Sequence, residues 1–401
     1  MTQDQSPAKP RERLPHEVWV LAVVGLVIAI GFGVMSPVLP IYARTFGVSS
    51  FLIGLVTSSL SILRLSTMPV SSWLLRFTGP RELAIIGCIL VGFPTFMIGI
   101  SNSYWGVLIW RGLSGFGSAL YGVSAMALLF AVSPPHQRGR ANAVYGGGFV
   151  IGAMIGPAVG GLIVAISLNA PFYFYAVALA ISAIILVIFL PRTDAPARKE
   201  VRNRGAGLVG LIKDNRFRAV IVVQFSNGWQ SWGVRALLVP LFVVEVAQKS
   251  TTWAGIAFAI AATAQAACLP LAGWGTDHLG RRPMLLIGCA LTGTMSVGFA
   301  LTNSYLVLVI LMCIYSIGVS FLGSSAQAML ADTVPTSTPS GIAAFQMAGD
   351  SGAILGPLVA GAVLDLASMP IAWLIGAGFI TIAGVMTWIT PSAIRPPAVM
   401  K

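Results

Sequence analysis

A ten-residue segment occurs twice in this chain, 200 positions apart. It reads G-A-M-I-G-P-A-V-G-G at Gly152–Gly161 and G-A-I-L-G-P-L-V-A-G at Gly352–Gly361. Other features recur at nearly the same interval: Gly33 with Pro40 against Gly233 with Pro240, Pro69 against Pro270, and Gly79 against Gly280. One half of the chain is therefore a copy of the other, and two similar halves are expected in the fold.

Most of this chain is too apolar to face water. Hydrophobic residues make up 56% of it and charged residues 9%, whereas a soluble domain carries about 25% charged residues. A helix needs about 20 apolar residues to cross a bilayer. Twelve such stretches are predicted, near residues 18–43, 50–75, 82–100, 104–132, 140–168, 171–190, 219–246, 252–274, 283–301, 304–332, 341–367 and 371–390. The expected fold is an all-α membrane protein with twelve transmembrane helices in two pseudo-symmetric six-helix bundles, a duplicated architecture typical of transporters.

One long polar connection divides six predicted spans from six. The expected organisation is a cytoplasmic tail at 1–17, an N-terminal bundle at 18–190, a basic cytoplasmic linker at 191–218, a C-terminal bundle at 219–390 and a second tail at 391–401. Of the 24 Lys and Arg residues, 19 fall on one side of this topology. The positive-inside rule then places both termini in the cytoplasm, in a multi-pass protein of the cytoplasmic membrane. Nucleic acid is excluded as a partner for the net charge of +12, because no soluble domain presents it.

The connection between the eighth and ninth spans is the most specific string in the chain. It reads G-W-G-T-D-H-L-G-R-R-P at Gly273–Pro283, which resembles the cytoplasmic loop motif of the major facilitator superfamily. In that family the loop latches the two bundles in one conformation. The resemblance implies the major facilitator fold, and a gating role for Gly273, Asp277, Gly280, Arg281 and Arg282.

The matching loop of the first half departs from this pattern. Gly79 and Arg81 remain and are expected to share in gating, but Arg76 stands where the family has aspartate. A latch that relies on a carboxylate is not expected there, so the Asp277 side should contribute more to closure.

The repeated G-x-x-x-G-P segments resemble the fifth-helix motif that is characteristic of exporters and antiporters in this superfamily. Glycines four residues apart let helices approach closely, and proline bends a helix by removing a backbone donor. Helix packing alone also explains the glycines. The residues expected to act in packing or as hinges are Gly152, Gly156, Pro157, Gly160, Gly161, Gly352, Gly356, Pro357 and Gly361.

Four charged residues fall well inside predicted spans: Arg64, Arg111, Arg235 and Asp350. Charges at membrane depth are costly and usually functional. If all four are ionised the interior carries two excess positive charges, which suits an anionic or zwitterionic substrate. Arg64 and Arg235 are therefore hypothesised to bind an acidic group of the substrate; the alternative is that either arginine only fixes helix packing.

Neutral side chains near these arginines are expected to complete a substrate site. The hydrogen-bonding set is Gln224, Asn227, Gln230 and Gln265, the last at the position that the repeat places opposite Arg64. Trp229 and Trp232 are expected to stack on a ring-bearing substrate, although lipid-facing or interfacial tryptophan is the commoner arrangement.

Asp350 and Arg111 are the residues expected to couple transport to protons. Asp350 is the one acidic side chain placed to carry a proton through the membrane, but a fixed Asp–Arg pair or a helix hydrogen bond are open alternatives. Burial favours the neutral form of a carboxylate and a neighbouring arginine favours the ionised form. Arg111 begins the string R-G-L-S-G-F-G-S, which is similar to the family's fourth-helix motif; a structural arginine bound to helix carbonyls is the alternative.

The predicted function is secondary active transport, specifically proton-coupled efflux of a small anionic or zwitterionic organic molecule by alternating access. Proton-coupled uptake of an organic acid or a sugar is the alternative. A membrane-embedded enzyme or receptor is remote, because His16, His136 and His278 all fall in cytoplasmic segments and no catalytic cluster is visible. No cofactor or metal is expected, the proton gradient should supply the energy, and the protein should function as a monomer in the lipid bilayer.

Overall fold

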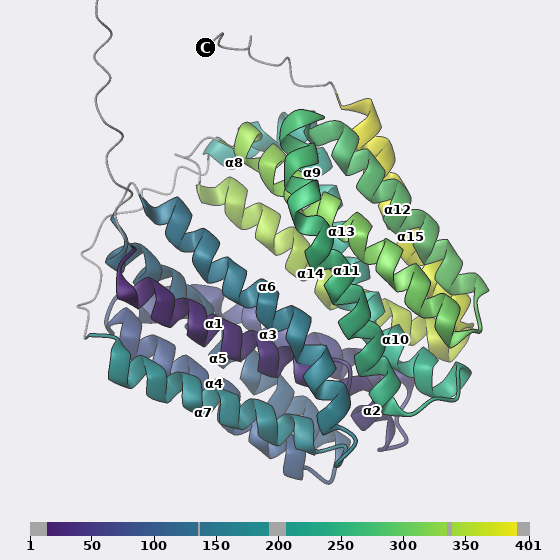
Figure 1. Ribbon diagram of the computed structural model, residues 1–401, viewed down its shortest axis with the longest axis horizontal. Helices are drawn as coiled ribbons and strands as arrows, with labels where there is room; N and C mark the ends of the chain where they lie inside the picture. Colours follow the sequence, from purple (N-terminus) through teal and green to yellow (C-terminus); the bar gives the residue numbers. More distant parts are fainter. Residues whose placement is uncertain (1–13, 135–136, 192–205, 335–338, 391–401) are drawn as a thin grey trace, which may run out of the picture.

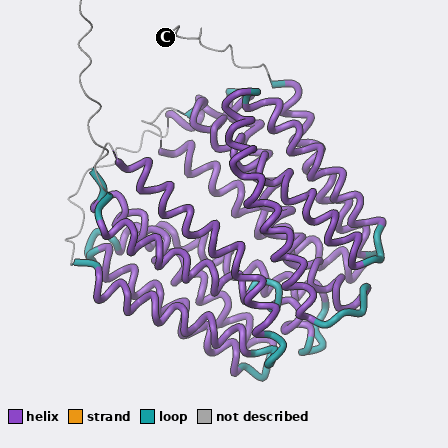
Figure 2. The backbone as a smooth tube through the Cα atoms, in the orientation of Figure 1, coloured by secondary structure: helices purple, strands orange, loops and turns teal. Residues whose placement is uncertain are grey.

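The computed structural model describes residues 14–134, 137–191, 206–334 and 339–390. Figure 2 shows that these ranges are helical almost throughout, with short loops and no strand among them. The first half contains α1 His16–Met35, α2 Leu39–Arg44, α3 Ser50–Leu74, α4 Pro80–Ile100, α5 Tyr104–Val132, α6 Arg138–Ile163 and α7 Ala170–Phe189. The second half contains α8 Ala206–Lys213, α9 Asn215–Asn227, η2 Gly228–Val234, α10 Arg235–Leu241, η3 Phe242–Val246, α11 Thr251–His278, α12 Arg281–Leu301, α13 Tyr305–Thr333, α14 Pro339–Leu366 and α15 Met369–Ile389.

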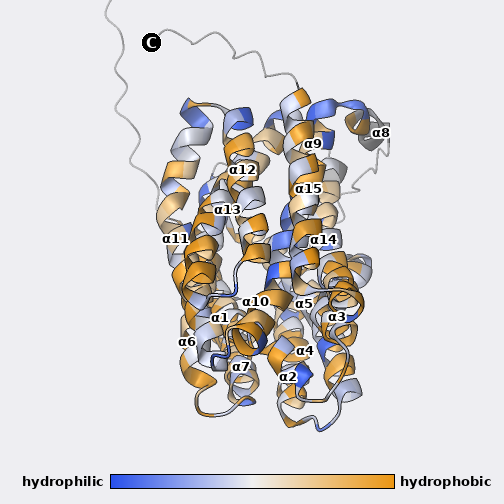
Figure 3. Ribbon diagram, turned by 90° about the vertical axis from the view of Figure 1, so that its right-hand side faces the viewer, coloured by the Kyte–Doolittle hydropathy of each residue, from blue (hydrophilic) through white to orange (hydrophobic). Residues whose placement is uncertain are grey.

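Within these ranges, 11 helical segments are long and apolar enough to cross a membrane, with α1 and α2 together forming the first. The twelfth span is α9–η2–α10–η3, which is helical without interruption from Asn215 to Val246. Two π-helical segments divide it, so no single α-helix within it is long enough to span. The prediction of an all-α, twelve-span fold is therefore confirmed, and Figure 3 shows hydrophobic colouring along most of the helix lengths with hydrophilic residues at their ends.

The equivalent first and seventh spans differ in how proline affects them. Pro37 separates α1 from α2, and Pro40 lies in the first turn of α2, where a missing backbone donor costs nothing. In the second half Pro240 remains inside α10, but Leu237 replaces Pro37, and the helix continues through this region. The first span is therefore broken into two helices, whereas the seventh span stays continuous and contains π-helical segments.

The two halves form two bundles that pack in the same way, as Figure 1 shows by their colours. In the first bundle α1 packs on α6 and α7, and α4 packs on α5 and α7. In the second, η2 packs on α14, and α12 packs on α13 and α15. The repeated glycines make matching contacts: a Cβ on Gly33 would meet Gly156 and Pro157, and one on Gly233 would meet Gly356 and Pro357.

The bundles touch each other mainly through two crossings, α3 on α14 and α6 on α11. We call the end of the molecule where α1 begins and α15 ends the terminal face, and the other end, with residues 45–49 and 247–250, the opposite face. At the first crossing, a Cβ on Gly54 would fall against the carbonyl oxygen of Pro357, and one on Gly361 against that of Ser50. These contacts all lie toward the opposite face.

The second crossing repeats this geometry with other residues. A Cβ on Gly255 would fall against the carbonyl oxygen of Pro157 and the backbone of Gly161. Gly146, Gly147 and Gly273, which lie toward the terminal face of α6 and α11, have open space beside them instead. The bundles are thus in contact at the opposite face and apart at the terminal face.

Candidate functional site

An ion pair joins the two bundles where their contact ends. The Arg64 guanidinium of α3 donates a hydrogen bond through Nη2 to Oδ1 of Asp350 on α14. The Arg64 side chain is 34% exposed and that of Asp350 is 13% exposed. Nearer the opposite face, the Ser58 hydroxyl donates to the carbonyl oxygen of Ile354 at 2.7 Å. The pair therefore lies at the boundary between the closed crossing and the separated part of the molecule.

Asp350 has one direct partner on the other bundle, and a pair of this kind is compatible with the proton-carrying role that the sequence left open for it. In this conformation its carboxylate pairs with an arginine of the other bundle. The two partners belong to bodies that must part if the opposite face opens, so the pair contributes to holding this conformation. An ion pair that is largely shielded from water loses more when it is broken than an exposed pair does.

A chain of polar contacts lines the middle of the second bundle. Asn227 accepts a hydrogen bond from the Ser231 hydroxyl at 2.9 Å, and that hydroxyl lies 2.9 Å from the Tyr315 hydroxyl. The Arg235 guanidinium lies over the Tyr315 ring at 5.3 Å and donates to Ser316 at 3.2 Å. Two of the predicted residues, Asn227 and Arg235, are thus connected at α13 through Ser231 and Tyr315, which sequence reasoning missed.

The remaining predicted polar residues lie close to this chain or to the ion pair. Gln224 packs over Gly349, the residue before Asp350. Gln265 is partly exposed on α11, and its backbone carbonyl accepts from Ser320 at 2.9 Å. Trp232 is 59% exposed and lies on the helix face between Gly228, which packs on α14, and Ser231, which contacts α13.

Two predicted substrate-binding residues lie inside the second bundle instead. Trp229 is 4% exposed and packs against Phe225 and Phe379 with ring centroids 6.0 and 4.5 Å away. Gln230 is fully buried and donates to Ser296 at 2.8 Å. Trp229 thus packs on α15 and Gln230 on α12, away from the face shared by Asn227 and Ser231.

Arg111 lies apart from the ion pair, in the core of the first bundle. It is 4% exposed, its Nη1 lies 3.7 Å from the sulfur of Met35 and its guanidinium lies 6.0 Å from the Phe32 ring centroid. Among the described residues, neither Arg111 nor Arg235 has a carboxylate within ion-pair distance. The two excess positive charges expected from the sequence are thus divided between the bundles, one in each.

The loop at the terminal face contains the residues for which the sequence predicts a gating role. Asp277 is exposed at the end of α11, while Arg281 pairs with Asp332 of α13 at 2.7 Å. Gly280 adopts a φ of 103°, so the turn there requires glycine. Gly273 faces open space, since the bundles are apart at this end of α11.

The two halves also share an anchor at this face. Arg81 donates to the carbonyl oxygen of Val187 at 2.6 Å, and Arg282 donates to that of Trp388, its repeat equivalent. Each arginine ties the start of the third span of its bundle to the end of the sixth. Gly79 is extended rather than left-handed, so the first loop does not repeat the Gly280 turn.

Every glycine of the repeated segments meets backbone or side-chain atoms of another helix. Gly152, Gly156 and Gly160 pack on α1, and Gly352 and Gly356 pack on the α9–η2–α10 helix. Gly161 and Gly361 instead pack on the other bundle, each beside the second span of that bundle. The repeated motif therefore holds each bundle together at one end and joins the two bundles at the other.

Carboxylates at span ends, to which the sequence analysis gave no role, also join the bundles. Asp365 at the end of α14 accepts hydrogen bonds from the backbone N–H groups of Ser50 and Phe51, both at 2.8 Å. Glu245 of η3 pairs with Arg44 of α2 at 2.8 Å. Few basic residues fall at the opposite face, and Arg44 is one of them. Its unusual place was the one sequence signal that could have pointed to this ion pair.

Replacing Asp365 by alanine is expected to weaken closure at the opposite face. Its carboxylate satisfies two backbone donors at the start of α3, and loss of such a cap costs about 1 kcal/mol. The thermal unfolding midpoint of the purified protein should fall. Asp365→Asn, which keeps one acceptor oxygen, should fall less; a larger fall for asparagine than for alanine would contradict the capping role.

These features define a class of protein. Two duplicated helical bundles, closed at one face, with ionisable residues between them and within each bundle, form a multi-pass membrane transporter. In the part of the chain that the structure describes, no group of three His, Cys, Asp or Glu side chains is placed to hold a metal ion.

Comparison with known proteins gives the family. The family model described as Major Facilitator Superfamily matches residues 21–250 and 220–399, so the chain belongs to the Major Facilitator Superfamily. Its members are transporters and not enzymes, and the resemblance stated from the loop motif is confirmed.

Individual relatives are more distant. The quinolone resistance protein NorA of Staphylococcus aureus is 28% identical over 178 residues, which cover 43% of this chain and 45% of that protein. The match thus spans less than half the length of this curated relative. An uncharacterized MFS-type transporter of Methanocaldococcus jannaschii is 22% identical over 94% of this chain and 98% of its own length.

Solved structures share the fold. A bacterial homolog of the human lysosomal transporter Spinster, in an inward-facing and unoccupied conformation, has a TM-score of 0.78 at 16% identity and covers 94% of this chain and 96% of that chain. A point mutant of the nucleoside transporter NupG has a TM-score of 0.77 at 16% identity and covers 92% of this chain and 98% of that chain.

Proposed function

We propose that this protein exports a small zwitterionic organic molecule in exchange for protons, by alternating access across the cytoplasmic membrane with its terminal face in the cytoplasm. The Arg64–Asp350 pair between the bundles carries the proposal. When cargo and proton are both absent, the two charges bind each other and hold the bundles in one conformation. Cargo or a proton releases them.

With a zwitterionic cargo, the Arg64–Asp350 pair can exchange its internal contact for two contacts with the cargo. Its acidic group would replace Asp350 at Arg64, and its cationic group would replace Arg64 at Asp350. A proton on Asp350 removes the partner of the cationic group, so proton and cargo compete for one site. Competition for one carboxylate is the physical requirement for antiport, because only one of the two ligands then travels in each direction.

The second bundle offers the rest of the site. Arg235, the Asn227–Ser231–Tyr315 chain and the exposed indole of Trp232 would contact the cargo beyond the ion pair. Export is supported by the resemblance of the repeated glycine segments to the fifth-helix motif of exporters, and by a relative named for quinolone resistance. In the opposite conformation Asp277 would latch the terminal face. We place the function in a single chain.

Uptake by symport is the second candidate, and one observation favours it for a purely anionic cargo. A proton on Asp350 would free Arg64, which would then bind the acidic group of the cargo, so anion and proton would bind together rather than compete. The charge of the cargo therefore decides between exchange and cotransport at the same ion pair.

Proteoliposome transport separates the two candidates. Three compounds on one aromatic scaffold should be compared, an amino acid, its N-acetylated anion and its cationic amide, with a proton gradient imposed in either direction. We expect the zwitterion to move fastest against the proton flow and the cation to move slowest. Movement of the anion with the protons at the highest rate would establish symport and contradict export.

A further inference from the structure

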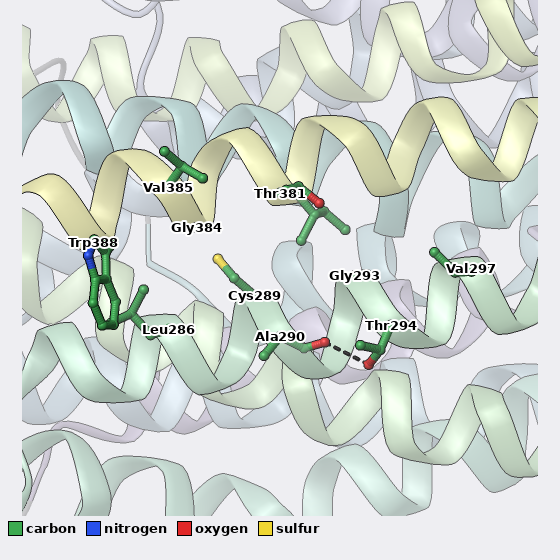
Figure 4. Close-up of a pocket in the computed structure, with 11 residues that line it drawn as sticks. Leu286, Cys289, Ala290, Gly293, Thr294, Val297, Thr381, Gly384, Val385 and Trp388 are labelled. Carbon is green, nitrogen blue, oxygen red and sulfur yellow. Dashed lines mark hydrogen bonds between the residues drawn. The ribbon is translucent and has the colours of Figure 1, made fainter.

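The outer surface of the second bundle has a groove between α12 and α15 of about 450 Å³. Its walls include Leu286, Ala290, Gly293 and Val297 of α12, and Ile380, Thr381, Gly384 and Trp388 of α15. Figure 4 shows these side chains along the space between the two helices. Both helices cross the membrane and lie on the side of the bundle away from the first bundle, as Figure 1 shows. The groove therefore opens toward lipid.

The groove presents little polarity to an occupant. The Thr294 hydroxyl donates to the carbonyl oxygen of Ala290 at 2.7 Å, and the Thr381 hydroxyl donates to that of Ala377 at 2.9 Å. From Leu286 to Val297 the groove runs along α12 for about 16 Å at 1.5 Å per residue. Half of a hydrocarbon core of roughly 30 Å has the same length. An alkyl chain in one leaflet fits both the polarity and the length.

The duplication supplies a comparison within the same molecule. Arg81 with Val187 and Arg282 with Trp388 fix the equivalence of the α4–α7 and α12–α15 pairs. At the positions of Ala290, Thr294 and Val297, the first bundle has Ile89, Phe93 and Phe96, and Ala183 stands at the position of Gly384. The first copy thus carries larger side chains where the second copy has small ones.

The mouth of the groove lies at the terminal face and is positively charged. Trp388 lies in the last turn of α15, and the Arg282 guanidinium in the first turn of α12 lies 5.9 Å from its ring centroid. Tryptophan and arginine gather at the level of lipid headgroups, and a basic residue there attracts anionic lipid. We propose that this groove binds one acyl chain of an anionic phospholipid, whose phosphate lies beside Arg282.

Photo-crosslinking tests this site on the full-length protein in nanodiscs. The probe is phosphatidylglycerol with a diazirine in the middle of one acyl chain, diluted in phosphatidylcholine, and the labelled peptides are mapped by mass spectrometry. We expect label in 281–301 and 369–389, and several-fold less in the equivalent 80–100 and 170–189. The same diazirine on phosphatidylcholine should label the groove several-fold less.

Variants that exchange the two surfaces make the test specific. Ala290→Ile with Thr294→Phe copies the first bundle and should remove most of the groove label. Ile89→Ala with Phe93→Thr should create label on the α4–α7 surface, which keeps the test informative if the filled variant fails to fold. Arg282→Gln should remove the preference for phosphatidylglycerol.

Four outcomes would overturn the proposal. They are equal labelling of both bundles, equal labelling by the two headgroups, undiminished label in a folded Ala290→Ile, Thr294→Phe variant, and protein–protein cross-links through the groove. The last would show a second copy of the chain as the occupant instead of lipid.

Discussion

Replacing Asp350 by asparagine is expected to abolish transport driven by a pH gradient. Asparagine resembles the protonated carboxylic acid, so the variant has no site at which a proton can come and go, and Arg64 loses its partner from the other bundle. The rate with an imposed gradient should fall to the rate without one. Proteoliposomes with matched protein content give both rates.

The same variant should change binding in a direction that depends on cargo charge. A free Arg64 should bind the anionic analogue more tightly, by about tenfold or more, because a hydrogen bond to a charged group contributes roughly 1.5–3 kcal/mol. The zwitterion should bind more weakly, since its cationic group loses a carboxylate. Asp332→Asn is the control, because the Arg281–Asp332 pair lies within one bundle. Gradient-driven transport that persists in Asp350→Asn would place the proton carrier elsewhere.

Replacing Gly54 by alanine is expected to cut the transport rate by about 5- to 150-fold, which corresponds to a shift of roughly 1–3 kcal/mol between the two conformations. A Cβ at this position would fall against the carbonyl oxygen of Pro357 in the other bundle. The backbone of α14 cannot yield locally, so the opposite face would close less well. The variant should populate the conformation with that face open.

Gly378→Ala is the matched control for this effect. Gly378 lies in α15 with no atom near a Cβ, and alanine in a helix interior is favoured over glycine by about 0.5–1 kcal/mol at either position. Both variants therefore gain the same helix propensity, but only Gly54→Ala meets the other bundle. Conformation can be followed by the rate at which a thiol reagent reaches a cysteine placed at Ser50, which is buried at this crossing while the opposite face is closed. Equal transport in the two variants would contradict a role for this crossing in closure.

The helices were predictable from the sequence because apolar length and the repeat define them. Span seven is an example: predicted at 219–246, it runs from Asn215 to Val246. The side-chain directions within that span were not predictable. An α-helical period puts Asn227 and Gln230 on one face, but the wider π-helical turn groups Asn227, Ser231 and Arg235 and turns Gln230 to the other side. Nothing in the residue types indicates where a helix widens.

The charged residues could be found from the sequence, but their partners could not. Arg64 and Asp350 stand out because each lies in the middle of an apolar span. The repeat relates Arg64 to Gln265, and it gives no relation between Arg64 and a residue 286 positions away. Such a pairing depends on how two separately folded bundles meet. The partner of Asp365 was unpredictable for the same reason, since its carboxylate accepts hydrogen bonds from the backbone of α3 in the other bundle.

The two crossings between the bundles are built alike and hold with unequal strength. Where α3 meets α14, the contact includes Asp365 on two N–H groups, the Ser58 hydrogen bond and the Arg64–Asp350 pair. Between residues 157–161 and 252–255 of α6 and α11, the structure shows backbone contact and no hydrogen bond. Opening of the opposite face should therefore begin at the α6–α11 crossing, while the α3–α14 crossing acts as a hinge. The bundles would then separate asymmetrically, and cargo would leave beside α6 and α11 before α3 and α14 separate.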